Sequence, residues 1–484
     1  MFSTIYSGAV CGLQAYLIRV EVDLAGGLPA FLMVGSLGSE VRESRERVCV
    51  AMKNSGFQIP PGHITVNLAP ADRRKDGTAF DLPIAIGLLQ DMELLKEDAV
   101  KDTLFLGELG LNGEIKKAKG VLPIVREATR RGIHRVIVPR ENALEAAVIP
   151  GVTVWGVGNL GELFTTLLHP GEDEEKIYRP RVCPEDLLKC SGGDRRGDFR
   201  EVAGQESARR GALIAAAGFH NLLMMGPPGV GKSMIAGRIP GILPPLTLEE
   251  SLEVTSIYSV AGLLPPEQAL ITERPFYAPH QNVTLAALIG GGAAVPRPGM
   301  VSLAHRGVLF LDELPQFQRV VLDSMRQPLE ERRVQIARSA GLITYPSDFM
   351  LVAAMNPCPC GNYGSRDRRC TCTPNEIRRY RARVSGPLLD RIDIQVEVDG
   401  VAYDDLVSEK REETSAEVKE RTDAARRIQR ERFKGGRVTT NGEMGESELR
   451  EYCRLSKEGE EVLREAFSRL KLSARARSRI LKVA

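Results

Sequence analysis

The chain has 484 residues, enough for about two to four domains, and its 43% hydrophobic and 26% charged content is typical of globular proteins. A formal net charge of only +2 excludes a molecule that attracts nucleic acid over its whole surface, so such binding must be local. No apolar run has the length of a membrane span, and the N-terminus lacks a signal-peptide pattern. With nine cysteines, most of them scattered, these features predict a cytoplasmic protein that makes no membrane contact.

Changes in the hydrophobic pattern divide the chain into the segments 1–168, 169–197, 198–400 and 401–484. In the first segment, Ile64–Leu68 and Arg135–Val138 are predicted strands, and Leu82–Leu89 and Val121–Arg131 are predicted helices. The second segment is charged and aperiodic, which is typical of a linker. The last is charged and helical, with Val418–Phe433 as its clearest helix. The chain stops inside an apparent helix without a cap, so we expect this helical segment to be cut short.

A phosphate-binding loop is predicted at Gly226-Pro227-Pro228-Gly229-Val230-Gly231-Lys232-Ser233. It follows an apolar run, His220–Met225, that predicts a buried strand, and it precedes a predicted helix, Met234–Ile239. In that context the glycines let backbone N–H groups wrap a polyphosphate, and the helix N-terminus adds positive charge. We expect Lys232 to reach the β- and γ-phosphates of ATP and Ser233 to bind Mg²⁺. The alternative, a chance match, is nearly eliminated by the acidic motif that follows.

That acidic motif is an apolar run, Val308–Leu311, followed by Asp312 and Glu313. The pattern predicts a buried parallel strand whose end lines the ligand crevice of an open α/β sheet. Asp312 is expected to bind Mg²⁺, directly or through water, and Glu313 to polarise the attacking water. Alone, the pattern also fits an ordinary strand with a solvated acidic end, but after a phosphate-binding loop it favours the catalytic role.

A basic hairpin strand is predicted at Arg332–Arg338, after the acidic motif. Its arginines, Arg332, Arg333 and Arg338, would neutralise a nucleic-acid backbone, which gives binding that is independent of sequence and weakened by salt. The alternative is that these are ordinary surface charges on an edge strand.

A third buried strand is predicted at Phe349–Met355, and Asn356 follows it with an amide that is placed to contact the γ-phosphate or to orient water. Shortly afterwards come four cysteines in two C-x-C pairs, Cys358, Cys360, Cys370 and Cys372. Four thiolates suit tetrahedral Zn²⁺, although C-x-C is tighter than the usual spacing. The alternative is four free thiols packed beside the strand end.

Two further arginines lie in patterns that, alone, fit surface salt bridges. Arg391 stands between apolar residues and acids in Leu388–Asp393, and Arg475 opens a basic helical stretch at Ser473–Ala476.

Taken together, these motifs resemble an AAA+ ATPase of the magnesium-chelatase-like group, specifically the ComM (YifB) family. The resemblance covers almost the whole chain and includes the stretches Gly26–Phe31, Val41–Arg47, Ile64–Asp72, Phe80–Ala85, Ile289–Gly292, Ser302–His305 and Ser385–Asp393. It implies ATP and Mg²⁺ as cofactors, Asn356 as sensor 1, Arg391 as the arginine finger and Arg475 as the sensor-2 arginine. Because such a finger acts on a neighbouring subunit, the resemblance also implies an ATP-dependent ring, expected to be a homo-hexamer. An arginine delivered to a transferring phosphoryl group stabilises transition-state charge.

The fold class that the resemblance implies is α/β, with a Lon-protease-like N-terminal domain, an AAA+ P-loop domain with a parallel sheet, and a small helical lid. The Ser–Lys dyad of a Lon-type peptidase would fall at Ala79 and near Leu122, so neither nucleophile nor base is present. The nearby lysines at 116, 117 and 119 are expected to form a solvated basic turn. We therefore expect this domain to be a scaffold for the ring, with DNA contact left open.

The resemblance implies an ATP-driven DNA motor for branch migration or unwinding in recombination and natural transformation, with DNA bound independently of sequence. One alternative is a magnesium-chelatase motor subunit, although true subunits of that kind lack this N-terminal domain. An ATP-dependent protease is disfavoured by Ala79 and Leu122. A decayed scaffold is disfavoured because four residues of the expected active site are intact, namely Lys232, Asp312, Glu313 and Arg391.

Overall fold

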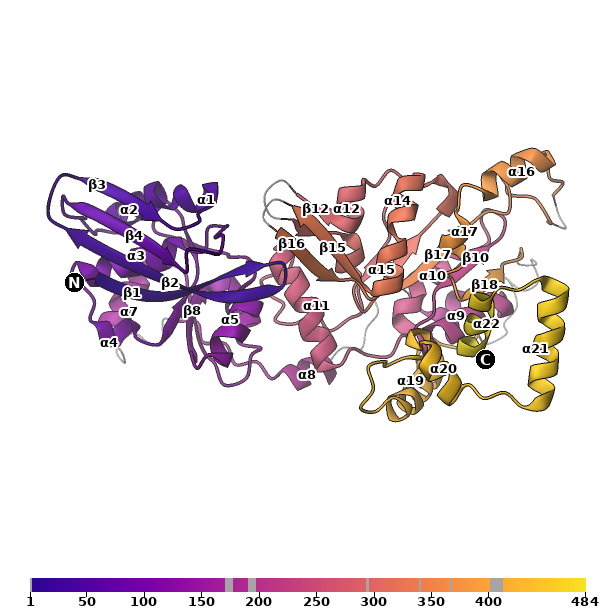
Figure 1. The fold of residues 1–484 in the computed structure, drawn as a ribbon. Helices are drawn as coiled ribbons and strands as arrows, with labels where there is room; N and C mark the ends of the chain where they lie inside the picture. The colour runs from indigo at the N-terminus through magenta and orange to yellow at the C-terminus, as the bar shows by residue number, and fades with distance from the viewer. Residues whose placement is uncertain are drawn as a thin grey trace.

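The computed structural model describes residues 2–169, 177–189, 197–292, 296–338, 341–365, 368–400 and 412–484. Much of the predicted linker, at 170–176 and 190–196, lies outside these ranges. The molecule is elongated, with one sheet at the N-terminal end and a second sheet, followed by the C-terminal helices, at the other (Figure 1). Within the described ranges, no helix combines the length and the apolar character needed to cross a membrane.

The N-terminal domain is built on a seven-stranded mixed sheet in the order β3-β4-β2-β1-β5-β8-β9. Its strands are β1 (Phe2–Cys11), β2 (Gln14–Ala25), β3 (Ala30–Val34), β4 (His63–Ala69), β5 (Thr103–Phe105), β8 (Arg135–Pro139) and β9 (Thr153–Val157). Its longer helices are α2 (Ser44–Asn54), α3 (Asp81–Asp91), α5 (Val121–Arg130) and α7 (Leu160–Leu168). The two strands and two helices predicted for this segment are confirmed, with ends that shift by at most two residues.

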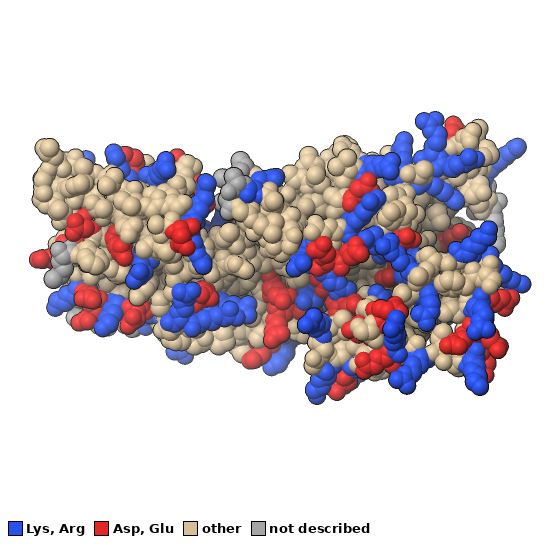
Figure 2. Space-filling view, in the orientation of Figure 1, with Lys and Arg blue, Asp and Glu red and all other residues tan. Residues whose placement is uncertain are grey.

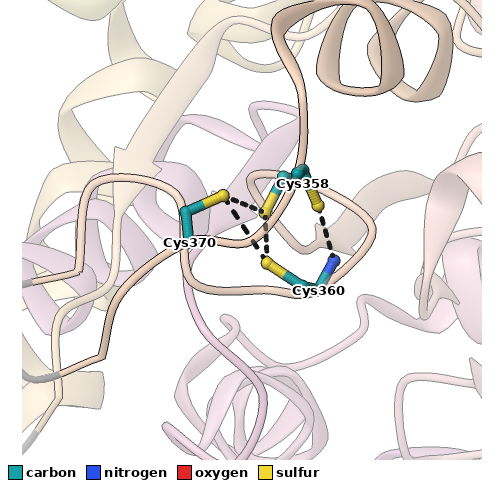
Figure 3. Close-up of side chains that lie close together, drawn as sticks. Cys358, Cys360 and Cys370 are labelled. Carbon is teal, nitrogen blue, oxygen red and sulfur yellow. Dashed lines mark hydrogen bonds between the residues drawn. The ribbon is translucent and has the colours of Figure 1, made fainter.

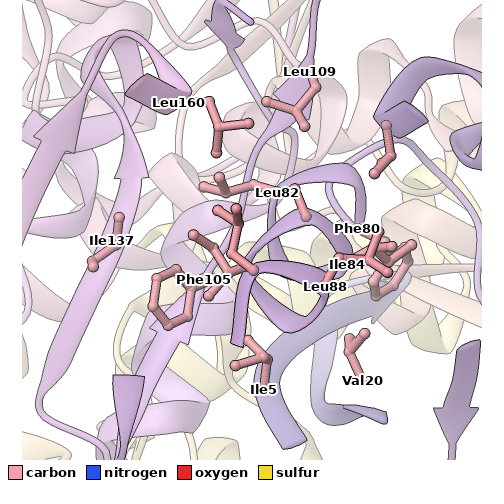
Figure 4. Close-up of a cluster of buried hydrophobic side chains, with 14 of the residues drawn as sticks. Ile5, Val20, Phe80, Leu82, Ile84, Leu88, Phe105, Leu109, Ile137 and Leu160 are labelled. Carbon is pink, nitrogen blue, oxygen red and sulfur yellow. The ribbon is translucent and has the colours of Figure 1, made fainter. Parts of the chain in front are cut away.

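Helix α3 is the centre of this domain's core. Its residues from Asp81 to Leu89 are all buried, which is why the segment is apolar nearly all round. Leu82, Ile84 and Leu88 lie among side chains from the surrounding strands (Figure 4). Each such side chain contributes roughly 1.5–3 kcal/mol on burial. The charged residue in this buried stretch, Asp81, accepts from Arg47 Nε at 2.7 Å, which compensates for the burial that raises the pKa of the Asp81 carboxyl.

The second domain, which the sequence leads us to expect is the ATPase domain, contains a five-stranded, all-parallel sheet in the order β11-β14-β17-β10-β18. Its strands are β11 (Phe276–Tyr277), β14 (Val308–Leu311), β17 (Met350–Met355), β10 (Leu222–Met225) and β18 (Ile394–Glu397). The helices α9 (Glu206–Gly218) and α10 (Lys232–Ile242) flank β10 in the chain, and a buried cluster joins α9 and α10 to the central strands. The three predicted strands are confirmed as β10, β14 and β17.

The two domains meet where α5 contacts α11 (Leu248–Ala261) of the ATPase domain. The Gly120 N–H donates to Ser259 O at 3.0 Å, and Lys117 Nζ donates to Leu264 O. The turn between β1 and β2 also touches the ATPase domain, since a Cβ on Gly12 would lie 2.8 Å from Ile343 Cγ2. The expectation of a purely solvated basic turn is therefore wrong for Lys117, whose ammonium is a partly buried contact between domains.

The C-terminal region is helical, with α19 (Ser415–Arg432), α20 (Glu446–Tyr452), α21 (Lys457–Leu470) and α22 (Ala474–Val483). A capping box of Thr414 and Glu417 starts α19, three residues before the predicted helix. This helix packs on α9 and α10, where Thr422 Oγ1 donates to Ile242 O at 2.7 Å and Gln429 Nε2 donates to Ala217 O at 2.9 Å. The C-terminal helical region is thus tied to the helix that carries the phosphate-binding loop.

Candidate active site

The phosphate-binding loop joins the C-terminal end of β10 to the N-terminus of α10. Gly229 and Gly231 have φ values of 82° and 85°, a conformation that favours glycine. Among the described residues, the N–H groups of Gly229, Val230 and Gly231 find no acceptor within the chain. Unpaired donors beside a helix N-terminus form a ready anion site, so the loop fits a polyphosphate.

Lys232 is the first residue of α10, and its ammonium lies inside the loop. Its side chain is almost fully enclosed: Nζ donates to Gly226 O and Pro227 O at 2.7 Å each and to Asn356 Oδ1 at 3.2 Å. Burial lowers the pKa of Lys232, while the carboxylates of Asp312 and Glu313 oppose that shift. An anionic ligand would supply the counter-charge that this buried cation lacks.

The two acids, Asp312 and Glu313, follow the C-terminal end of β14, and Asp312 meets the first turn of α10 there. Ser233 Oγ donates to Asp312 Oδ2 at 2.6 Å, so a hydroxyl and a carboxylate suited to Mg²⁺ are already side by side. Glu313 has φ of 51°, and its carboxylate accepts from Gln281 Nε2 at 2.9 Å. A neutral amide is therefore the hydrogen-bond partner of the carboxylate that is expected to be catalytic.

The register of the sheet explains why these groups converge. Strand β17 lies between β10 and β14, and all three run parallel, so their C-terminal ends lie at one edge. Asn356 follows β17 directly and meets Lys232 there. The structure thus brings together Lys232, Ser233, Asp312 and Asn356, with Glu313 beside them.

Arg391 lies at the opposite end of the same sheet, where the parallel strands begin. It precedes β18, which begins opposite the start of β10, and Asn221 Nδ2, just before β10, donates to Arg391 O at 2.8 Å. Strand β10 has four residues and so spans roughly 13 Å between this edge and the phosphate-binding loop. The guanidinium pairs with Glu330 and donates to Pro387 O at 2.7 Å. The Arg391 side chain therefore lies far from the loop of its own chain.

Arg475 lies near Arg391 and away from the chain's own phosphate-binding loop. Its Nη1 is 3.9 Å from Asp390 Oδ2, and its side chain is 61% exposed. The neighbouring Arg479 binds more closely, because its Nη1 donates to Leu389 O and Ile392 O at 3.2 and 2.8 Å. Helix α22 is thereby fixed to the segment that carries Arg391, and both candidate arginines face a pocket of about 480 Å³ at this edge.

The four cysteines form one cluster. Their Sγ atoms lie within 4.8 Å of one another, and Cys358 Sγ is 3.4 Å from Cys360 Sγ and 3.7 Å from Cys370 Sγ (Figure 3). Cys372 Sγ accepts from the Cys360 N–H at 3.4 Å. Tetrahedral zinc with Zn–S bonds of about 2.3 Å places sulfurs about 3.8 Å apart, so the donor set fits that metal.

The predicted basic strand differs from expectation at its start. The strand is β15 (Arg333–Arg338), paired with β16 (Gly341–Pro346), while Arg332 precedes it with φ of 55°. The Arg332 guanidinium pairs with Glu443 of the C-terminal region and lies 3.4 Å from Asp348. Arg332 therefore already has two acidic partners within the chain, and the prediction that it contacts DNA stays untested. Residues 339 and 340 lie outside the described part.

Of the other two arginines of this hairpin, Arg333 lies at the base and pairs with Glu331 at 3.2 Å, and Arg338 lies at the tip. Arg338 Nε lies 3.5 Å from Gly292 O, so β15 and β16 lie beside a second hairpin of β12 (Gly290–Gly291) and β13 (Arg297–Pro298). Arg297 and Arg338 are both exposed near the ends of these two hairpins, and neither forms an ion pair among the described residues. The pattern of the sequence did not single out Arg297.

Lysine and arginine side chains also gather over α16 (Pro374–Arg381), which follows the cysteine cluster (Figure 2). Arg378, Arg379 and Arg383 are exposed there and have no acidic partner among the described residues. Arg381 is tied inward, since its Nε donates to Pro357 O at 3.1 Å. A chain with a net charge of only +2 therefore carries a strong local concentration of positive charge.

Three functional candidates escape local sequence patterns: Gln281, Arg297 and Arg479. Gln281 lies in a loop after β11, and only the pairing of β11 with β14 brings it to Glu313. The other two are single arginines in a chain with 65 lysines and arginines, so residue type alone does not mark them as functional.

Comparison with known proteins gives matches over most of the chain. Family models described as magnesium chelatase subunit ChlI, subunit ChlI of Mg-chelatase, and magnesium chelatase subunit ChlI C-terminal match residues 198–406, 20–142 and 412–484. The competence protein ComM of Haemophilus influenzae is 40% identical over 483 residues, which cover 99% of this chain and 92% of that protein. The uncharacterized protein YifB of Escherichia coli is 40% identical over 486 residues, covering 100% and 92%. Lon protease 2 of Bacillus subtilis is 30% identical over 149 residues, covering 28% and 26%.

Proposed function

This chain belongs to the magnesium-chelatase-like ComM/YifB family of AAA+ ATPases, and on that basis we propose that it is a ring-forming motor that hydrolyses ATP to translocate on DNA. The observation that supports ATP hydrolysis is the convergence of Lys232, Ser233, Asp312 and Asn356 at one edge of the parallel sheet. The name of the relative ComM connects it with competence, and we extend to this chain a role in branch migration or unwinding during recombination and natural transformation.

Each residue then has a distinct role in hydrolysis. Lys232 and the N–H groups of the loop hold phosphate oxygens, and Ser233 and Asp312 hold Mg²⁺, which neutralises charge on those oxygens. Glu313, once released from Gln281, takes the proton of the attacking water, and Asn356 orients that water. Arg391 supplies positive charge to the phosphates bound by a neighbouring subunit, because its own loop lies at the other edge of the sheet.

The proposed assembly follows from this separation. A site that needs Arg391 from a second copy is complete only between subunits, and a closed ring, which we propose to be a hexamer, gives every loop such a partner. Arg475 lies at the same edge as Arg391, so we propose that it too acts on the neighbouring site.

DNA is the proposed substrate because the positive charge is local. The hairpin ends that carry Arg297 and Arg338 belong to the same domain as the ATP site and offer charges that no acid neutralises among the described residues. Peptide cleavage is disfavoured, since Ala79 and Leu122 occupy the positions of a Lon-type dyad.

Replacing Arg297 and Arg338 together by alanine is expected to weaken binding of single-stranded or forked DNA and to make the salt dependence shallower. Each lost phosphate contact removes about one released counterion, so the slope of log K against log [salt] should fall by about one per arginine. Fluorescence anisotropy at several salt concentrations measures both quantities, and basal ATP hydrolysis should stay nearly unchanged.

The matched control is Arg469→Ala on α21, an exposed arginine on a different domain that should leave DNA binding unaltered. If Arg378→Ala/Arg379→Ala abolishes binding instead, the DNA path runs over α16. If the wild-type chain neither binds DNA at low salt nor changes its ATP turnover with DNA, the DNA-motor proposal fails and a chelatase-type motor becomes the better account.

The cysteine cluster is proposed to hold one Zn²⁺ per chain, with Cys358, Cys360, Cys370 and Cys372 as ligands. Elemental analysis of protein purified without chelator should find about one zinc per chain. Cys360→Ser and Cys372→Ser should lose it, while Cys453→Ser, a cysteine of the C-terminal region, should retain it. Four thiols that titrate freely in metal-free wild-type protein would show that the cluster is packing only.

A further inference from the structure

A pocket of about 360 Å³ lies beside the phosphate-binding loop, within the size range of ligand sites. Most of its lining comes from the loop itself, Pro227 to Gly231, from residues between Glu201 and Gln205 that precede α9, and from three residues of the loop between the cysteines. Met234 and Gly400 complete the lining. When the phosphate-binding loop holds the phosphates of a nucleotide, the nucleoside part must lie in the space next to that loop. The pocket therefore offers a site for the nucleoside part.

The cysteine loop contributes Asn362, Ser365 and Arg368 to this pocket. Arg368 is exposed and forms no ion pair among the described residues, so its guanidinium is available to a ligand. It follows Cys360 and precedes Cys370 in the chain, and both of these cysteines belong to the four-cysteine cluster. A metal ion that held these two cysteines in place would therefore hold both ends of the segment that carries Arg368.

The cysteine loop also touches the phosphate-binding loop directly. Cys358 to Gly361 form a turn closed by the Gly361 N–H, which donates to Cys358 O at 3.0 Å. Gly361 has φ of 81°, and a Cβ at this position would lie 2.5 Å from Cδ of Pro228. The proline ring is rigid and itself lines the pocket, so a shift of the cysteine turn toward the phosphate-binding loop must move Pro228.

The metal-free cluster has little to hold this arrangement. Thiols form only weak hydrogen bonds, whereas four bonds to one Zn²⁺ fix the positions of all four sulfurs. On these grounds we propose that the four-cysteine loop is a metal-held wall of the nucleotide pocket, and that Arg368 on it binds the nucleotide. The inference rests on the proposed function, since it takes ATP as the ligand of the adjoining loop.

The test is the affinity of the full chain for a fluorescent ATP analogue. It is measured for zinc-loaded protein, for protein stripped of zinc by a chelator, and for stripped protein after zinc is added back. The Mg²⁺ concentration is the same in all three measurements. Stripping should weaken binding about tenfold, and zinc should restore it. Arg368→Ala should weaken binding by a similar factor, the size expected for a lost hydrogen bond from a charged group, with zinc content unchanged. Since Arg368 is exposed, this variant tests the proposal even if stripped protein unfolds.

Arg369→Ala is the matched control, because Arg369 is the next residue, is also exposed, and does not line the pocket. It should leave affinity within about twofold of wild type. Unchanged affinity in Arg368→Ala, or equal losses in both variants, would overturn the inference. Lys232→Ala distinguishes failure of the proposed function from failure of this inference. If Lys232→Ala also leaves the affinity for the ATP analogue unchanged, the proposed function has failed. If Lys232→Ala loses binding while Arg368→Ala binds normally, only the role of the cysteine loop is refuted.

Discussion

Glu313→Gln should lower the rate of ATP hydrolysis by roughly 10²–10⁴-fold, the usual contribution of a general base. Binding of ATP should persist, because Lys232, Ser233 and Asp312, which hold the phosphates and Mg²⁺, are unchanged. The substitution keeps the size of the side chain and removes only its charge, and the new amide can still pair with Gln281. Steady-state turnover and nucleotide affinity, measured on the same preparation, check both halves of this expectation.

The same variant should trap the assembled state. If ATP stabilises the ring and is no longer hydrolysed, size-exclusion chromatography with ATP should show a large species that persists. Glu249→Gln, an exposed acid at the start of α11, should behave as wild type. A Glu313→Gln protein that binds ATP and remains a monomer would contradict the proposed assembly.

Arg391→Ala should lower hydrolysis by roughly 10³–10⁵-fold, as expected for an arginine that stabilises phosphoryl-transfer charge. Nucleotide affinity of the isolated chain should stay close to wild type, because Arg391 lies at the far edge of the sheet from its own loop. Wild-type turnover per chain should also rise with protein concentration, since the site needs a second copy. Loss of ATP affinity in monomeric Arg391→Ala protein would indicate a local structural effect.

Arg326→Ala provides the matched control for Arg391→Ala. Arg326, like Arg391, has an acidic partner, because its Nη2 donates to Asp323 Oδ1 at 2.7 Å, but it does not line the pocket that contains Arg391. Its loss should leave catalysis nearly intact.

The central strands could be predicted because they are buried on both faces. Val308–Leu311 and Met350–Met355 therefore read as unbroken apolar runs. The edge strand β18 is different: Ile394 and Val396 are half-buried while Gln395 and Glu397 are exposed, and its four residues give too short an alternation to recognise.

The site was predictable where function depends on local order along the chain. Lys232 and Ser233 directly follow the glycines of the loop, and Asp312 and Glu313 directly follow an apolar strand. The residues next to each pair in the sequence are therefore enough to identify it. Pairings across long separations could not be predicted in this way. Arg332 was placed in the basic strand, but its carboxylate partner Glu443 belongs to the C-terminal region, and no local pattern signals that ion pair.

Mixing two inactive variants tests the shared active site most directly. Lys232→Ala lacks the phosphate-binding lysine but keeps Arg391, whereas Arg391→Ala keeps the complete loop and lacks the arginine. If subunits exchange Arg391 across an interface, equimolar mixtures should recover ATP hydrolysis well above either variant alone, at sites where an intact loop meets an intact arginine. The recovery should depend on total protein concentration. Arg391→Ala protein that hydrolyses ATP at the wild-type rate, or mixtures that assemble yet recover nothing, would contradict an active site completed between subunits.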